Sequence, residues 1–236
     1  MPNTFFRFQR FVVHQERCAM KVGTDGVLIG AWAKGGRRVL DIGTGTGLVA
    51  LMMAQRYRQA RVDAVDIDPE CCLQAEENVA DSPFPDRVEV FCSPVQTFAN
   101  DDARKGLYDA VVSNPPFFDN ALKAPDSSRR MARHTDSLPF AELFQTVSVV
   151  MAPLGEFSAI IPFDYKLMFE REAAAAGLYL ARSCAVKTTP TKNPKRYLLA
   201  FRKQHSDFVE VAEEVLEVSP GCRSVWYRQL TSDFYL

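Results

Sequence analysis

Short apolar runs alternate along the chain with longer segments whose apolar residues recur at helical spacing. Arg38–Ile42 is the first such run, and a glycine-rich turn and a helix over residues 48–57 follow it. The same pattern predicts strands over residues 62–68, 87–92, 108–112 and 157–162, and helices over residues 70–81, 140–151 and 165–176. Gly155 is expected to end the second of these helices. This alternation is typical of a parallel sheet covered by helices.

Both ends of the chain depart from the alternation. Residues 178–186 and 196–201 are predicted strands joined only by a loop, so they must pair antiparallel, and a short strand near residues 214–218 and a helix over residues 224–234 follow. Residues 1–20 are predicted as a short strand or cap, and Thr24 or Asp25 is expected to cap a helix that ends near Ala33.

We therefore expect an α/β fold with a seven-stranded, mostly parallel sheet, an antiparallel last hairpin and helices on both faces. One domain is expected over residues 1–236. It divides into an N-terminal cap over residues 1–37, a core over residues 38–203, and a C-terminal strand and helix over residues 204–236.

A polar segment follows the strand over residues 108–112 and reads Ser113-Asn114-Pro115-Pro116-Phe117. Two consecutive prolines end the strand pairing, which places Asn114 at a strand's carboxyl end, where open α/β sheets bind ligands. The Asn114 amide oxygen and the Pro115 carbonyl offer two acceptors, and Phe117 offers a stacking surface. Together they suit a planar amine or amide NH₂ group. Taken alone, the segment is equally compatible with a plain turn, because Asn and Pro favour turns.

The glycine-rich turn after the first strand reads Gly43-Thr44-Gly45-Thr46-Gly47, and Asp41 stands two residues before it. A strand, such a turn and a helix bring backbone close to a ligand at the helix amino terminus. The dinucleotide fingerprint fails here, because Leu48 occupies its third glycine position. An acid ahead of alternate glycines suits a ligand with a cationic amino group, such as the methionine end of S-adenosylmethionine.

Two further segments carry candidate ligand contacts. An acid that closes the second strand, about 20 residues after a glycine turn, is placed to accept both hydroxyls of a ribose. We prefer Asp66 over Asp68, because Asp68 precedes Pro69 and is suited to cap the next helix. Lys21 and Thr24 are polar candidates in a loop that ends at a helix amino terminus, where carboxylates are readily held.

Composition is ordinary for a soluble globular protein, with 47% hydrophobic and 24% charged residues. No apolar run approaches the roughly 18 residues that span a bilayer, and the amino terminus lacks an apolar signal core, so we expect a cytoplasmic protein. The six cysteines lack zinc-ligand spacing; we expect reduced thiols rather than disulfides, and no metal.

Charge is unevenly distributed, although the net charge is only −1. Residues 187–203 carry six basic side chains and no acidic one, which leaves 22 basic against 29 acidic residues elsewhere. We interpret this run as a phosphate-facing patch, although a solvated loop has the same composition. Its candidate RNA contacts are Lys187, Lys192, Lys195 and Arg196.

A long polar stretch over residues 119–139 carries a second basic group. Loops of this length within a domain are usually functional or disordered. Its candidate RNA contacts are Arg129, Arg130 and Arg133. His134 is a conceivable general base, but we do not assign it that role, because a methylated amine becomes acidic and loses its proton to water.

Together, residues 41–47, Asp66 and the Asn-Pro-Pro-Phe segment resemble class I S-adenosylmethionine-dependent methyltransferases that act on amino groups. Adenine-N6 and glutamine-N5 enzymes share the Asn-Pro-Pro-aromatic element. More narrowly, residues 21–28 and 230–236 resemble the bacterial valine-tRNA (adenine-37-N6)-methyltransferase family. This resemblance extends over nearly the whole chain, from about Phe8 onward.

The resemblance implies a Rossmann-like class I methyltransferase fold, S-adenosylmethionine as cofactor and a tRNA adenine, at position 37 of a valine tRNA, as substrate. The expected catalytic residues are Asn114, Pro115, Pro116 and Phe117. The expected cofactor contacts are Lys21, Thr24, Asp41, Gly43, Gly45, Gly47, Asp66, Ser93 and Asn114. We expect a monomer that requires neither a metal nor a membrane.

Three positions depart from related methyltransferases. Many have an acid after the third strand that accepts from the adenine of the cofactor, where this chain has Ser93 and Pro94. Asn114 stands where other families use aspartate, and Phe117 replaces the commoner tyrosine. Neither of the last two changes removes the chemistry.

Two other functions stay open. A protein glutamine N5-methyltransferase shares the Asn-Pro-Pro-aromatic element, but it normally has a substrate-recruiting domain ahead of the cofactor fold, and only a short stretch precedes Val39. A non-catalytic RNA-binding protein on the same scaffold is the other alternative. The intact glycine turn and Asn114 argue against it.

Overall fold

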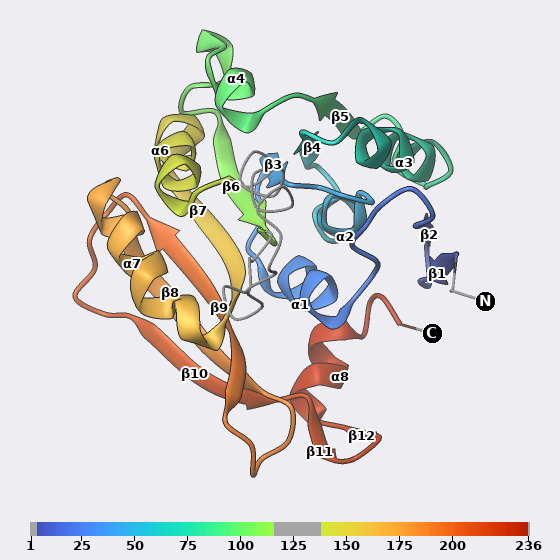
Figure 1. Ribbon diagram of the computed structural model, residues 1–236, viewed down its shortest axis with the longest axis vertical. Coiled ribbons are helices and arrows are strands. Elements are labelled where there is room, and N and C mark those ends of the chain that lie inside the picture. Colours follow the sequence, from blue (N-terminus) through green and yellow to red (C-terminus); the bar gives the residue numbers. More distant parts are fainter. Residues whose placement is uncertain (1–3, 116–137, 236) are drawn as a thin grey trace, which may run out of the picture.

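The computed structural model describes residues 4–115 and 138–235, and the account that follows concerns those residues. At its centre is an eight-stranded sheet (Figure 1). The spatial order is β10 (Glu210–Val215), β8 (Tyr179–Lys187), β9 (Pro194–Arg202), β7 (Met151–Pro162), β6 (Tyr108–Ser113), β3 (Arg38–Ile42), β4 (Arg61–Asp66) and β5 (Val88–Cys92). All neighbours are parallel except the two pairs that involve β9. The predicted α/β class, with a mostly parallel sheet, is confirmed.

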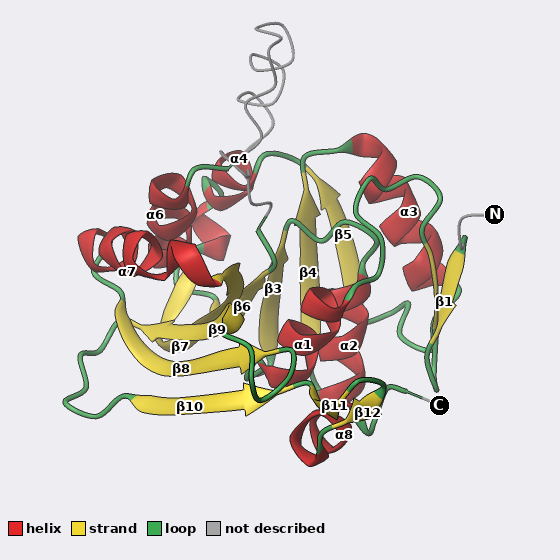
Figure 2. Cartoon of the chain, turned by 60° about the horizontal axis from the view of Figure 1, so that its bottom comes forward, coloured by secondary structure: helices red, strands yellow, loops and turns green. Residues whose placement is uncertain are grey.

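Helices cover both faces of this sheet, and Figure 2 shows α6 and α7 lying over β7, β8 and β9. The helices of one face are α1 (Thr24–Trp32), α2 (Leu48–Arg56), α3 (Pro69–Ala80) and α8 (Val225–Thr231). Those of the other are α4 (Val95–Ala99), α6 (Phe140–Val150) and α7 (Lys166–Ala175). Two apolar clusters fill the layers between, and along β3 Val39 faces the first cluster and Leu40 the second. Burial on both faces explains why the strands read as continuous apolar runs.

Two small hairpins lie outside the main sheet. They are β1 (Phe5–Arg7) with β2 (Val12–His14), and β11 (Glu217–Ser219) with β12 (Cys222–Arg223). The first is the strand or cap predicted for residues 1–20, and the carboxyl terminus holds it in place. Gln9 Nε2 donates to the carbonyl of Ser232 at 3.0 Å, and the rings of Phe8 and Tyr235 stack with centroids 6.0 Å apart.

The main sheet has one strand more than the predicted seven. The strand expected near residues 214–218 is β10, which lies farther toward the amino terminus and pairs parallel with β8 at the sheet edge. None of its residues is fully buried, and it carries three glutamates. An edge strand needs no apolar run, so its hydrophobic pattern is weak.

Two predicted helix boundaries are wrong. Gly155 does not end α6, which stops at Val150. It lies inside β7, where a Cβ atom would come within 2.8 Å of the Tyr108 carbonyl oxygen. Close approach of β6 therefore requires this glycine. At α1 the N-cap is Gly23, and no side chain caps the helix, so neither Thr24 nor Asp25 has that role.

Candidate functional site

Several of the predicted site residues lie at the carboxyl ends of neighbouring strands, which form one edge of the sheet. β6, β3 and β4 lie side by side and parallel, and Ile42 of β3 pairs with both Ser113 and Val65. The glycine turn, Asp66 and Asn114 directly follow these positions. The chain runs from β3 outward to β5 and returns to β6 on the other side of β3, which is the arrangement that opens a ligand crevice at the strands' carboxyl ends.

The turn after β3 depends on three glycines with left-handed backbone. Their φ angles are +71° at Gly43, +55° at Gly45 and +80° at Gly47, the last being the N-cap of α2. A Cβ atom at Gly43 or Gly45 would meet nothing within 4 Å, so backbone conformation rather than crowding requires glycine there. The same open space leaves room for a ligand directly over the turn.

Asp41 braces this turn from inside the protein. It is only 1% exposed, and its Oδ2 accepts from the Thr44 hydroxyl at 2.6 Å and from the Ala50 amide at 3.1 Å. Burial raises the pKa of Asp41 to about 7, although the hydrogen bonds from Thr44 and Ala50 lower it. These bonds point into its own turn, so positioning the turn is the role that its geometry supports, and direct contact with a cofactor stays a prediction.

Asp66 connects the turn to the end of β4. Its Oδ2 accepts from the Gly45 amide at 2.8 Å, and its Oδ1 accepts from the Asp68 amide at 3.0 Å. Each carboxylate oxygen can accept a further bond, as the predicted contact with ribose hydroxyls requires. Asp68 caps α3 by accepting from the Glu70 amide at 2.9 Å, as predicted. Ser93 lies beside Asp66, because its amide donates to the Asp66 carbonyl at 2.9 Å.

Asn114 lies against the segment that leads into α1. Its Nδ2 donates to the sulfur of Met20 at 3.8 Å, and the next residue, Pro115, is buried. Lys21, which is exposed, and Thr24 follow Met20 closely and are thereby brought to the same edge. Because the Asn114 amide nitrogen donates to Met20, the Asn114 amide oxygen is the side-chain atom that can accept a hydrogen bond from a ligand. Sequence reasoning missed Met20, since no motif marks it.

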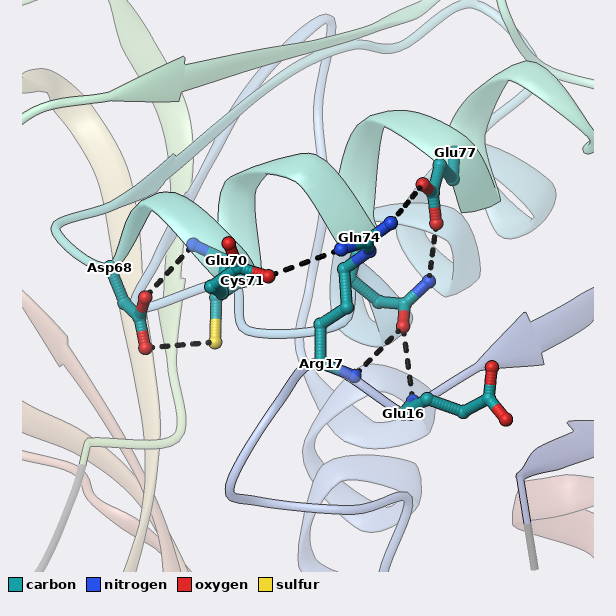
Figure 3. A network of polar contacts seen from close by, with 7 residues as sticks. All are labelled: Glu16, Arg17, Asp68, Glu70, Cys71, Gln74 and Glu77. Atoms are coloured by element: carbon teal, nitrogen blue, oxygen red, sulfur yellow. Dashed lines mark hydrogen bonds and ion pairs between the residues drawn. The ribbon is translucent and has the colours of Figure 1, made fainter.

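The structure also shows what holds the segment between β2 and α1 in place. In Figure 3, Gln74 of α3 accepts from the amides of Glu16 and Arg17, at 3.1 and 3.2 Å. The Arg17 guanidinium bridges Glu70 and Glu77, each at 3.2 Å. A hollow of about 650 Å³ lies here, and none of the predicted site residues lines it. These contacts fix the segment to α3.

Asn78 links His14, the last residue of β2, to the glycine turn. It is fully buried, and its Nδ2 donates to the carbonyls of Thr46 and His14, both at 2.8 Å. Its Oδ1 accepts from the His14 amide at 2.8 Å. The signal in the sequence is a polar residue next to Val79 on the apolar face of a helix, which sequence reasoning passed over.

The structure separates the four candidate RNA contacts near the β8–β9 hairpin into two groups. Lys187 pairs with Glu213 at 2.5 Å, and Arg196 pairs with Asp25 of α1, with Nε and Oδ1 2.9 Å apart. Lys192 and Lys195 are exposed. The hairpin loop follows β8, which runs parallel to β7 and β6, so it lies at the same sheet edge as Asn114.

Several predicted residues lie outside the described part of the chain. They are Pro116, Phe117, Arg129, Arg130, Arg133 and His134. Within residues 4–115 and 138–235, no three His, Cys, Asp or Glu side chains are grouped to hold a metal, and no helix is long and apolar enough to cross a membrane. All six cysteines are free thiols.

Comparison with known protein families and sequences gives consistent matches. Residues 22–138 match the family described as methyltransferase small domain. A tRNA1(Val) (adenine(37)-N6)-methyltransferase of Phocaeicola vulgatus is 47% identical and aligns with 100% of this chain and 99% of its own length. A protein of the same name from Trichodesmium erythraeum is 42% identical, with the same coverage of both chains.

Solved structures with a similar fold are also methyltransferases by description. A predicted O-methyltransferase from Agrobacterium tumefaciens superposes with a TM-score of 0.67 at 18% identity, over 89% of this chain and 96% of its own. A SAM-dependent methyltransferase from Aquifex aeolicus superposes with a TM-score of 0.52 at 17% identity, over 74% and 86%. At such low identities, these likenesses establish the fold alone.

Proposed function

The chain belongs to the tRNA1(Val) (adenine(37)-N6)-methyltransferase family, and on this basis we propose that it transfers a methyl group from S-adenosylmethionine to N6 of adenine 37 in a valine tRNA. The observation that carries this function is the match, over full length, to relatives named for that reaction. We propose that it acts on this tRNA in the cytoplasm.

The residues at the sheet edge fit S-adenosylmethionine. Open space lies over Gly43 and Gly45, where a side chain would point, and the Asp66 carboxylate keeps acceptor capacity beside it. We assign the methionine end to the glycine turn with Lys21 and Thr24, the ribose to Asp66, and the adenine to the surroundings of Ser93. The cofactor supplies an electrophilic methyl group on a sulfonium.

Asn114 and Pro115 are assigned to the target amine. The N6 nitrogen of adenine is a poor nucleophile, because its lone pair is delocalised into the ring. The Asn114 amide oxygen and the Pro115 carbonyl would accept its two hydrogens and orient the lone pair, and Phe117 would stack on the base. Catalysis is then mainly positioning, with the reacting atoms held about 3–3.5 Å apart.

Lys192 and Lys195 are assigned to the phosphates of the tRNA, since they are exposed at the sheet edge that carries Asn114. Phosphate contacts of this kind position a nucleic acid without reading its sequence. A base in a loop is extruded into a pocket at less cost than a paired one, which suits an anticodon-loop substrate.

The direct test is transfer of labelled methyl groups to total unmodified bacterial tRNA and to ribosome-free cell protein, followed by nucleoside and amino-acid analysis. We expect N6-methyladenosine in one tRNA species, and its loss from a transcript in which guanosine replaces adenine 37. Label in protein glutamine and none in RNA would indicate the glutamine N5 reaction instead. Cofactor binding without transfer to either would indicate a binding protein.

A further inference from the structure

Two aromatic rings stack at the sheet edge outside the residues assigned so far. Phe163 opens the 3-10 turn Phe163–Tyr165, directly after β7, and its ring lies 5.3 Å from the ring of Tyr197 with an interplanar angle of 17°. The rings of Phe157, Phe169 and Phe201 in the core are almost completely buried, whereas Phe163 is 39% exposed. The Phe163–Tyr197 pair is thus a nearly parallel stack that reaches the surface.

The position of this pair follows from the strand register. Ser113 at the end of β6 pairs with Ala159 of β7, and Tyr197 of β9 pairs with Ile161. Phe163 therefore lies beyond the same carboxyl edge as Asn114, one strand away. For straight strands about 4.8 Å apart with a rise of about 3.3 Å per residue, this offset corresponds to about 11 Å between the two Cα atoms. Bases in a stacked strand are about 3.4 Å apart, so this span corresponds to about three layers.

Two lysines lie near the stack, one in space and one in sequence. The Lys166 ammonium lies 5.3 Å from the centroid of the Tyr197 ring and is also paired with Glu170 at 2.7 Å. Lys195 precedes Tyr197 by two residues in β9, at an irregularity in the pairing with β8, and it is exposed. Aromatic rings interleaved with cations are the usual surface for unpaired bases, which stack on the rings while the cations meet the phosphates.

We propose that the Phe163–Tyr197 pair stacks a base of the anticodon loop that lies within about three nucleotides of the target adenine. This inference rests on the proposed function and adds a substrate contact to it. The target base itself belongs at Asn114, so the pair holds a flanking nucleotide and sets the register of the loop. Such a contact acts on RNA binding and leaves the methyl donor untouched.

The test compares Phe163→Ala, Phe163→Trp and Leu154→Ala with the unaltered protein. Leu154 is the matched control, since it is an apolar residue of β7 that is 80% exposed and lies toward the amino end of the strand. The substrates are an unmodified valine anticodon stem-loop and a series in which one abasic nucleotide replaces each base near adenine 37. Steady-state methyl transfer, cofactor affinity and melting temperature are measured for each protein.

We expect Phe163→Ala to raise KM for the stem-loop by roughly 5- to 150-fold, the range of one lost base stack. The kcat, the cofactor affinity and the melting temperature stay near their unaltered values, tryptophan restores KM, and Leu154→Ala changes nothing. One abasic substrate should raise KM for the unaltered protein by a similar factor, and it should cause no further rise in KM for Phe163→Ala.

Two outcomes overturn the inference while the proposed function stands. One is an unchanged KM in an active Phe163→Ala protein. The other is a loss of methyl transfer that is equal on every substrate and accompanied by a lower melting temperature. That result would mean that the pair only packs the turn against β9. If the unaltered protein methylates no RNA at all, the proposed function itself fails.

Discussion

The Thr44 hydroxyl donates to the Asp41 carboxylate across 2.6 Å, at a position where Asp41 is 1% exposed. The pKa of Asp41 is raised from 3.8 to about 7 by burial. The folded protein therefore keeps a proton that the unfolded chain releases between about pH 4 and 7, and this group's contribution to stability falls as pH rises through that window. Full ionisation costs about 4 kcal/mol on this basis.

We predict that Asp41→Asn flattens the pH dependence of the free energy of unfolding between about pH 4 and 7. Denaturant titrations of both proteins across this range measure the difference, which isolates Asp41 from other carboxylates. Thr44→Val removes a hydrogen bond that lowers the pKa of Asp41. In this variant the free energy of unfolding should therefore continue to fall to a higher pH than in the unaltered protein. Parallel curves for the unaltered protein and Asp41→Asn would contradict the assignment of this pKa.

Gly45 and Gly106 offer a matched pair of backbone tests. Both have left-handed backbone, with φ of +55° and +62°, and a Cβ at either would meet nothing within 4 Å. Alanine at each should cost a similar amount of stability, about 1–2 kcal/mol. Only Gly45→Ala should weaken S-adenosylmethionine binding, as measured by calorimetry, because Gly106 precedes β6 at the other end of the sheet. Equal cofactor affinity in the two variants would remove the glycine turn from the site.

Asn78 is predicted to matter to both stability and the site, because it joins His14 to Thr46. Asn78→Ala leaves buried backbone groups unpaired, and we expect a loss of about 2–4 kcal/mol in the free energy of unfolding together with weaker cofactor binding. The control is Gln96→Ala, which removes one exposed hydrogen bond to Glu142. A change as small as that of the control would show that Asn78 does not brace the turn.

The core of the fold was predictable from the sequence because each central strand is buried on both faces. Continuous apolar runs such as Arg38–Ile42 mark these strands, and the register then brings the glycine turn, Asp66 and Asn114 to one edge. β10 was placed too late in the chain, and the sheet was taken to have seven strands, because an edge strand with glutamates and partly exposed apolar residues carries little periodicity.

Tertiary contacts account for what sequence reasoning missed. A glycine after an apolar helix suggests a C-cap, but Gly155 is explained by the approach of β6, which no local pattern records. Arg196 looked like a free cation within a basic run, yet its partner, Asp25, lies far away in sequence. The contact between Met20 and Asn114 is of the same kind.

The ion pairs divide the basic hairpin into testable halves. We predict that Lys192→Gln with Lys195→Gln weakens tRNA binding and lowers the slope of log K against log salt concentration, by up to about one unit per lost phosphate contact. Arg196→Gln should instead lower stability, since it breaks the pair with Asp25. Filter binding across a salt series measures the slope. The control is Lys105→Gln, because Lys105 lies just before β6, at the end of the strands opposite to Asn114. A slope unchanged by the double substitution would place the RNA surface elsewhere.

The central claim is that Asn114 holds the amino group that is methylated. It is tested most directly by single-turnover methyl transfer to an unmodified valine tRNA by Asn114→Ala and Asn114→Asp, with cofactor affinity measured in parallel. We predict that alanine slows transfer by roughly 100- to 1,000-fold or more, with cofactor affinity changed by only a few-fold, and that aspartate, which keeps an acceptor oxygen, retains more activity. Transfer by Asn114→Ala at close to the unaltered rate would contradict the account.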